Sequence, residues 1–290
     1  MSVPSAYLGV IIIWSTTPLA IKWSGEGVGY LFGVSLRMLI GLLCILSLLW
    51  LMRRRLRWNG DSWPTFLIAG LQIYIAMTAT YWAAQHLPSG WVSVLFGLTP
   101  IVTSLLAWLW LREHRVSRGE IAGAILGFCG LLLIFSDSFR LDTMATWAVG
   151  AMLIAVFCHS AGAVLVKRLR SGVDGMSMTA GGLMVATPLF LITWGLIDGQ
   201  VPTAINQQNL GAIVYLGIFG SALGFSLYFF LLKNISVQAL ALITLLTPVL
   251  ALWWGKTLNN EMLTPHSIVG TAIILLGLAL SQWSVDSADH

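Results

Sequence analysis

The sequence has few charged residues for its length. Only 9% of its 290 residues are Asp, Glu, Lys or Arg, whereas soluble domains carry roughly 25%. By contrast, 58% of the residues are hydrophobic and the mean hydropathy is +0.87. This composition leaves too little polar surface for a soluble fold, so we expect the lipid bilayer to be a partner of the chain.

Cysteine and catalytic motifs are also scarce. The 3 cysteines, Cys44, Cys129 and Cys158, lie in apolar runs without a shared spacing, which excludes a disulfide framework and a cysteine metal site. The sequence has no acid pair within an apolar run, no cluster of metal-binding residue types and no G-x-S-x-G. We therefore expect no enzymatic activity, no cofactor and no metal.

Carboxylates are missing from the middle of the apolar runs, because all 11 Asp and Glu residues lie at their ends or between them. Ion-coupled carriers often hold a carboxylate inside the membrane, where its energetic cost marks a function. This absence favours facilitated diffusion or exchange over a carboxylate-driven pump, although a histidine or a backbone site could couple ions instead.

Ten apolar runs have the length that crosses about 30 Å of hydrocarbon as a helix. We predict membrane spans at 4–21, 30–52, 63–83, 88–111, 117–135, 148–166, 176–197, 210–232, 237–256 and 264–283. The first run has no basic segment before it and no clear cleavage site after it, so we expect it to remain as a helix. The connecting loops are too short for the soluble output domain of a membrane sensor or an assembly subunit.

Basic residues occur in short clusters between the apolar runs and not in one patch, which argues against a nucleic-acid partner. With a cytoplasmic N-terminus, most of the 15 lysines and arginines fall in inner loops, and the outer side holds only Lys22, Arg140 and Lys256. This asymmetry predicts that both termini are cytoplasmic, in a bacterial inner membrane. A monomer is the simplest expectation.

Four pairs of short motifs recur in the same order in the two halves of the chain. They are Trp14-x7-Lys22 with His159-x7-Lys167, Thr99-Pro100 with Thr247-Pro248, Glu113 with Glu261, and Gly123-x6-Gly130 with Gly270-x6-Gly277. These pairs predict two related units, 1–139 and 140–290. Because each unit holds an odd number of spans, the second must be inverted in the membrane. Inverted repeats are a recurring transporter architecture, with the substrate site between the repeats near the midplane.

Through these motifs, and through Arg37 in the second span, the chain resembles the EamA type of the drug/metabolite transporter superfamily over nearly its whole length. It departs from the usual pattern at His159, where an aromatic residue is more common. The resemblance implies an all-α membrane protein in which ten transmembrane helices, as two inverted five-helix repeats, surround a central cavity. It also implies a small-molecule substrate, with the fifth and tenth spans packed outside the cavity.

Trp14 and His159 are predicted at matching depths near the midplane. His159 lies roughly 16 Å into its span, where it could bind substrate, take a proton or bond to a neighbouring helix. Trp14 could stack on an aromatic or cationic substrate or fill packing space. Arg37, roughly 10 Å deep, could bind a substrate carboxylate or phosphate, snorkel to the outer interface or bond helix carbonyls.

In the third span, Tyr74, Thr78, Tyr81 and Gln85 follow steps of four, three and four residues and therefore share one helix face. Lipid offers no hydrogen bonds, so this stripe should face the cavity or a partner helix. We interpret it as a candidate substrate-binding face.

Tyr228 and Gln238 are weaker candidates from the second unit, because single polar residues in membrane helices often only bridge helices. Pro100 and Pro248 lie within predicted spans and should bend them, either as paired hinges of alternating access or as static bends. Glu261, like its counterpart in the first unit, precedes a span. A carboxylate is favourable at a helix N-terminus, which predicts a structural role.

These features predict a secondary transporter of small metabolites. An exporter of amino acids or related amphipathic compounds is the leading hypothesis. An uptake or exchange carrier for an anionic or sugar-like metabolite is the alternative. A non-transporting membrane sensor or assembly subunit is the competing class.

Overall fold

The computed structural model describes residues 2–54, 56, 62–111, 118–136, 143–169, 171–235, 240, 243–262 and 264–286. Within these residues the structure is helical and has no strand. Its helices are α1 (Val3–Gly25), α2 (Tyr30–Leu51), α3 (Trp63–Ala83), α4 (Ser89–Phe96), α5 (Thr99–Leu111), α6 (Arg118–Ser136), α7 (Thr143–Leu169), α8 (Gly175–Ile197), α9 (Gln207–Tyr215), the π-helix η2 (Leu216–Leu223), α10 (Gly224–Asn234), α12 (Ile243–Asn259) and α13 (Pro265–Asp286).

In the described chain, 7 segments are long and apolar enough to cross a bilayer as helices. They are α1, α2, α3, α4 with α5, α7, α8, and the continuous run from α9 through η2 to α10. The prediction of an all-helical, multi-pass membrane protein is thereby confirmed. Helices α6, α12 and α13 lie at the remaining predicted spans. The count of ten crossings stays a prediction, as does the division at 139/140, which falls outside the described residues.

Short polar side chains cap the N-termini of several of these helices. Asp174 precedes α8, and its carboxylate accepts hydrogen bonds from the backbone N–H groups of Met176 and Ser177 at 3.1 and 3.3 Å. Asn206 precedes α9 and accepts from the N–H of Asn209 at 2.7 Å. These caps satisfy N–H groups that a helix cannot pair internally. The apolar sequence that follows stays helical because lipid offers its backbone no other partner.

The span from Ser89 to Leu111 is interrupted between α4 and α5. Residues 97–98 form the break, and the hydroxyl of Thr99 donates to the carbonyl of Phe96 at 2.6 Å. The sequence predicts Pro100 in mid-helix, but the structure places it in the first turn of α5, because the helix already breaks before it. A proline there removes no helical hydrogen bond. Pro248 does lie inside a helix, α12.

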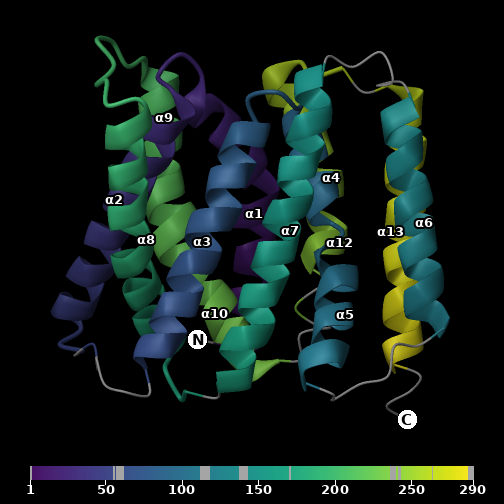
Figure 1. Cartoon of the computed structure of the whole chain (residues 1–290), viewed down its shortest axis with the longest axis horizontal. Coiled ribbons are helices and arrows are strands. Elements are labelled where there is room, and N and C mark those ends of the chain that lie inside the picture. Colours follow the sequence, from purple (N-terminus) through teal and green to yellow (C-terminus); the bar gives the residue numbers. More distant parts are fainter. Residues whose placement is uncertain are drawn as a thin grey trace.

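Helices from the two predicted units interleave (Figure 1). Helix α1 packs against α9, α10 and α12, and α3 packs against α7 and α8. Helix α2 contacts α8 and η2. Segments far apart in the sequence therefore enclose the middle of the molecule. Helices α6 and α13, at the predicted fifth and tenth spans, pair with each other at one side, on the right in Figure 1.

The pairing of α6 with α13 depends on the repeated glycines. A Cβ atom built on Gly130 would lie 2.6 Å from the carbonyl oxygen of Gly270, and one on Gly277 would lie 2.7 Å from that of Gly123. Real Cβ atoms do not approach other atoms this closely, so only glycine lets the two backbones come together. The two glycine motifs therefore pack against each other, and the contact is reciprocal.

Candidate functional site

A cavity of about 110 Å³ lies in the middle of the bundle, and residues of α1, α2, α3, α4, α5, α7, η2, α10 and α12 line it. The larger polar and aromatic side chains of its wall include Trp14, Arg37, Gln72, Phe96, His159 and Tyr228. Both predicted units contribute to this wall. Ligand pockets usually span about 300–1,000 Å³, so this cavity has to widen before it admits a ligand of ordinary size.

Four rings pack around one side of the cavity. The ring of Trp14 in α1 lies 5.3 Å from that of Tyr228 in α10 and 6.0 Å from that of His159 in α7, measured between centroids. His159 lies 5.2 Å from Tyr228 and 6.0 Å from Phe96 in α4. Trp14 and His159, predicted at matching depths, therefore meet at the cavity. Edge-to-face and tilted contacts of this kind hold the rings in place.

Gln72 of α3 fixes the orientation of His159. Its side-chain Nε2 lies 3.2 Å from Nδ1 of His159. This contact holds the imidazole ring against α3. Gln72 also lines the cavity, yet the candidate stripe of the third span omits it. In the sequence, Gln72 stands out only as a polar residue in the middle of a span. A hydrogen bond to a partner helix would explain such a residue equally well.

Arg37 of α2 is 1% exposed and lines the same cavity. Its Nε donates to the hydroxyl of Ser221 at 2.9 Å, and its Nη1 donates to the phenol oxygen of Tyr81 at 3.3 Å. The guanidinium carbon lies 5.8 Å from the centroid of the Tyr81 ring. Arg37 therefore does not snorkel to an interface, which was one of the alternatives open from the sequence.

The predicted stripe of the third span is not at the cavity. The hydroxyl groups of Tyr74 and Thr193 in α8 lie 2.6 Å apart, and Tyr74 and Thr78 line a separate shallow pocket with Tyr30 and Trp82. Tyr74 and Thr78 do lie on one face of α3, and Tyr74 contacts the partner helix α8 from that face. The structure thus corrects the expectation that Tyr74 and Thr78 face the cavity.

The other two members of the stripe, Tyr81 and Gln85, do not line the cavity either. Tyr81 is fully buried, and its phenol oxygen accepts from Arg37 and from the hydroxyl of Ser24 at 3.4 Å. Gln85 donates from Nε2 to the carbonyl of Tyr81 at 3.3 Å. Tyr81 therefore contacts the cavity residue Arg37 from outside the cavity, whereas Gln85 is exposed. Gln238 lies outside the described residues.

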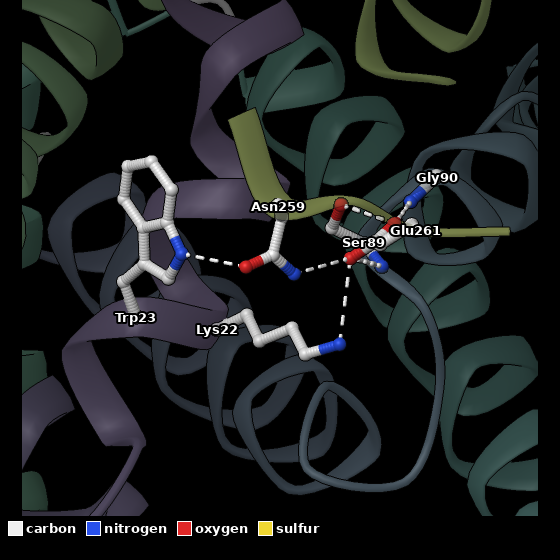
Figure 2. A network of polar contacts seen from close by, with 6 residues as sticks. All are labelled: Lys22, Trp23, Ser89, Gly90, Asn259 and Glu261. Atoms are coloured by element: carbon white, nitrogen blue, oxygen red, sulfur yellow. Dashed lines mark hydrogen bonds and ion pairs between the residues drawn. The ribbon is translucent and has the colours of Figure 1, made fainter. Parts of the chain in front are cut away.

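A cluster of polar contacts joins residues of the two predicted units (Figure 2). We call it the Glu261 clasp, and it consists of Lys22, Trp23, Ser89, Gly90, Asn259 and Glu261. The Glu261 carboxylate accepts from the N–H and the hydroxyl of Ser89 at 3.1 and 2.9 Å and from the Asn259 amide at 3.0 Å. Lys22 lies 3.4 Å from it. The clasp ties α1 and the start of α4 to the segment that follows α12.

The electrostatics of the clasp favour an ionised Glu261. Its burial acts to raise the pKa of the carboxyl, but hydrogen bonds from Ser89 and Asn259 and the charge of Lys22 outweigh this and hold the pKa below its ordinary value. The sequence predicts Glu261 at the N-terminus of the helix that follows it. The structure instead places its carboxylate at the N-terminus of α4, an equally favourable position. Its counterpart Glu113 lies outside the described residues.

A larger cavity, the vestibule, lies at the opposite end of the span from Ser89 to Leu111. It measures about 760 Å³, and the ends of α5, α7 and α10 surround it. Lys167, Arg168 and Lys233 line it, and no described acidic residue does. Phe229 lines both the vestibule and the central cavity and therefore lies between them.

Comparison with known proteins identifies the family. The profile of the EamA-like transporter family matches the chain twice, over residues 3–136 and 146–283. The chain belongs to the EamA-like transporter family. It is therefore a membrane transporter and not an enzyme.

Relatives of this EamA transporter cover nearly its whole length. The uncharacterized transporter YoaV of Bacillus subtilis is 24% identical over 280 residues, which are 96% of this chain and 95% of that protein. The S-adenosylmethionine/S-adenosylhomocysteine transporter of Chlamydia trachomatis serovar L2 is 26% identical over 285 residues, covering 92% of this chain and 85% of that one. One crystal structure, 18% identical, has a TM-score of 0.75 and covers 100% of this chain and 99% of its own. That likeness shows a shared fold.

Proposed function

We propose that this EamA transporter is a secondary carrier that exports amino acids or related amphipathic compounds through the central cavity. The composition of the cavity wall is the observation that carries the proposal. Apolar and aromatic side chains surround one guanidinium, of Arg37, and one imidazole, of His159. Such a wall suits a ligand with an apolar body and a few polar groups.

The proposed architecture is ten helices in two inverted units, 1–139 and 140–290. Contacts between repeated motifs support it, because Trp14 meets His159 and the two glycine motifs pack reciprocally. In inverted repeats, equivalent residues converge near the midplane. Helix α1 begins and α13 ends at the lower end of the bundle in Figure 1, and the basic loops favour the cytoplasm of a bacterial inner membrane for both termini.

The two ends of the cavity support alternating access. The Glu261 clasp joins the units at one end, whereas at the other end Phe229 lies between the cavity and the vestibule. Helices must move to admit a ligand, since the cavity measures only about 110 Å³. Pro248 within α12 and Pro100 beside the break at 97–98 are the proposed hinges.

Uptake or exchange of an anionic metabolite is the second candidate function. Arg37 favours it, because its guanidinium supplies the positive charge in the cavity wall. No carboxylate lines the cavity among the described residues, which favours facilitated diffusion or exchange over a carboxylate-driven pump.

Flux in proteoliposomes tests the proposal. Purified transporter is expected to carry at least one labelled amino acid or amphipathic metabolite faster than protein-free vesicles do. A matched pair of substitutions then locates the site: Tyr228→Phe should change the rate or selectivity, while Tyr74→Phe, outside the cavity, should retain wild-type flux. Absence of specific flux across a broad panel would overturn the proposal.

A further inference from the structure

Arg37 is a buried cation without an anion. Its side chain is 1% exposed, and neither ion pair of the described chain includes it. A guanidinium stays protonated in proteins, so burial cannot neutralise it. Burying a charge is unfavourable unless a partner of opposite sign compensates it. The two hydroxyl groups bonded to Arg37 are neutral and do not supply that charge.

The surroundings of Arg37 are shaped to hold its guanidinium. A Cβ atom built on Gly220 of η2 would lie 3.1 Å from Nη2, and one on Gly217 would lie 2.6 Å from the side chain of Ile40 in α2. Both glycines therefore let η2 approach Arg37 closely, and the same π-helix carries Ser221. Single π-helical turns occur frequently at functional sites.

The bonds of Arg37 leave one of its nitrogens for a ligand. Ser221 holds Nε and Tyr81 holds Nη1, whereas Nη2 has no hydrogen-bond partner among the described residues, and the side chain lines the cavity. Two hydroxyl groups thus fix the plane of the guanidinium, and Nη2 lies beside Gly220, which also lines the cavity. Such preorganisation lowers the cost of binding.

We propose that Nη2 of Arg37 binds a carboxylate or a similar monoanionic group of the transported molecule, within a cradle formed by Tyr81, Gly220 and Ser221. This inference rests on the proposed carrier function and specifies its substrate class. Tyr81 and Ser221 are positioning residues, since they act through Arg37. The same charge makes the cavity reject organic cations that lack an anionic group.

Matched probes test the need for an anionic group. L-phenylalanine, 3-phenylpropanoate and L-phenylalaninamide share a side chain, but only the first two carry a carboxylate, and leucine with its two analogues forms a second series. In proteoliposomes the carboxylates are expected to move about tenfold faster than the amides, the order of effect of one hydrogen bond to a charged group. Arg37→Gln is expected to bring this ratio to about one.

Positioning variants keep the test decisive if Arg37→Gln does not accumulate. Gly220→Ala should press on Nη2 and raise KM for the carboxylates more than KM for the amides. Ser221→Ala should raise KM for the carboxylates about threefold with little change in kcat, because a single neutral hydrogen bond is lost. Ser226→Ala is the matched control, since the Ser226 hydroxyl donates to the carbonyl of Ala222 in η2 and to the hydroxyl of Thr179 in α8, and Ser226 does not line the cavity.

The outcomes separate the two proposals. Equal flux of carboxylates and amides in the wild type, or a carboxylate preference that survives in Arg37→Gln, overturns the anion site and leaves the carrier function intact. No flux of these probes or of any compound in the broad panel above protein-free vesicles overturns the carrier function and this inference with it.

Discussion

Replacing Glu261 by alanine should destabilise the transporter far more than removing its ion-pair partner. The Glu261 side chain is 8% exposed and accepts three hydrogen bonds of 2.9 to 3.1 Å from Ser89 and Asn259. Two of these satisfy groups at the N-terminus of α4. Hydrogen bonds to charged groups contribute about 1.5 kcal/mol or more each, so after the cost of burial we expect a loss of about 3 kcal/mol.

The ion pair with Lys22 should contribute much less. The Lys22 nitrogen lies 3.4 Å from the carboxylate, and its side chain is 26% exposed, so water screens the charge. Pairs of this kind contribute about 0–1 kcal/mol. Lys22→Met is therefore expected to lower the free energy of unfolding by less than about 1 kcal/mol.

Unfolding by SDS in mixed micelles, followed by the fluorescence of the 14 tryptophans, measures both losses. Glu26→Ala is the control, because Glu26 is an exposed carboxylate at the same end of α1 and its loss should stay within about 0.5 kcal/mol. Equal losses in Glu261→Ala and Lys22→Met would refute the reasoning, since they would show that the ion pair and not the capping of α4 holds the clasp.

The clasp also has a definite pH dependence. The pKa of Glu261 is lower in the folded protein than the value of about 4.3 expected when it is unfolded. Its stabilising contribution is therefore complete above the unfolded value and is lost as the pH falls through the folded one. The stability difference between wild type and Glu261→Gln should be constant from about pH 5 to 8 and shrink below about pH 4. A difference that grows on acidification would contradict the assignment.

Three further predictions concern the cavity and the packing. Phe229→Ala should join the vestibule to the central cavity and raise the leak of small solutes several-fold in a liposome swelling assay; an unchanged leak would mean that another group separates them. Gly130→Leu should force α6 from α13 and lower the thermal midpoint, whereas Gly150→Leu, with nothing within 4 Å, should not. His159→Ala and Tyr81→Ala should each reduce flux about tenfold with a smaller change in protein level; wild-type flux in both would remove the cavity assignment.

The sequence predicts best those features that depend on spacing alone. Apolar length locates the helices, because a bilayer demands that length whatever the tertiary structure is. The repeat places Trp14 and His159 at one depth and sets the two glycine motifs apart from other glycines. These residues meet in the structure, as the predicted repeat leads us to expect.

Rotation about the helix axis is harder to predict. The spacing of Tyr74 and Thr78 shows that they share a face of α3, but not which neighbour that face meets. In the structure Thr193 satisfies Tyr74, and Gln72, which looks isolated in the sequence, lies at the cavity. The π-helix η2 is likewise not predictable from the sequence. Its apolar sequence is compatible with an α-helix, and the close approach to Arg37 becomes apparent only in three dimensions.

The two ends of the molecule differ in structure, although each carries the lysine of the same repeated motif. Lys22 and Lys167 hold equivalent positions in the two predicted units. Lys22 pairs with Glu261 in the clasp, whereas Lys167 lines the vestibule and donates to the carbonyl of Ile235 at 3.2 Å. The repeated lysine is thus bonded in the clasp in one predicted unit and lines the vestibule in the other. If the two units are inverted copies, each could adopt the arrangement of the other. That exchange would close the vestibule and open the end of the bundle that carries the clasp. We infer that the opposite state of the transport cycle requires no new kind of contact, only the arrangement that the other unit already adopts.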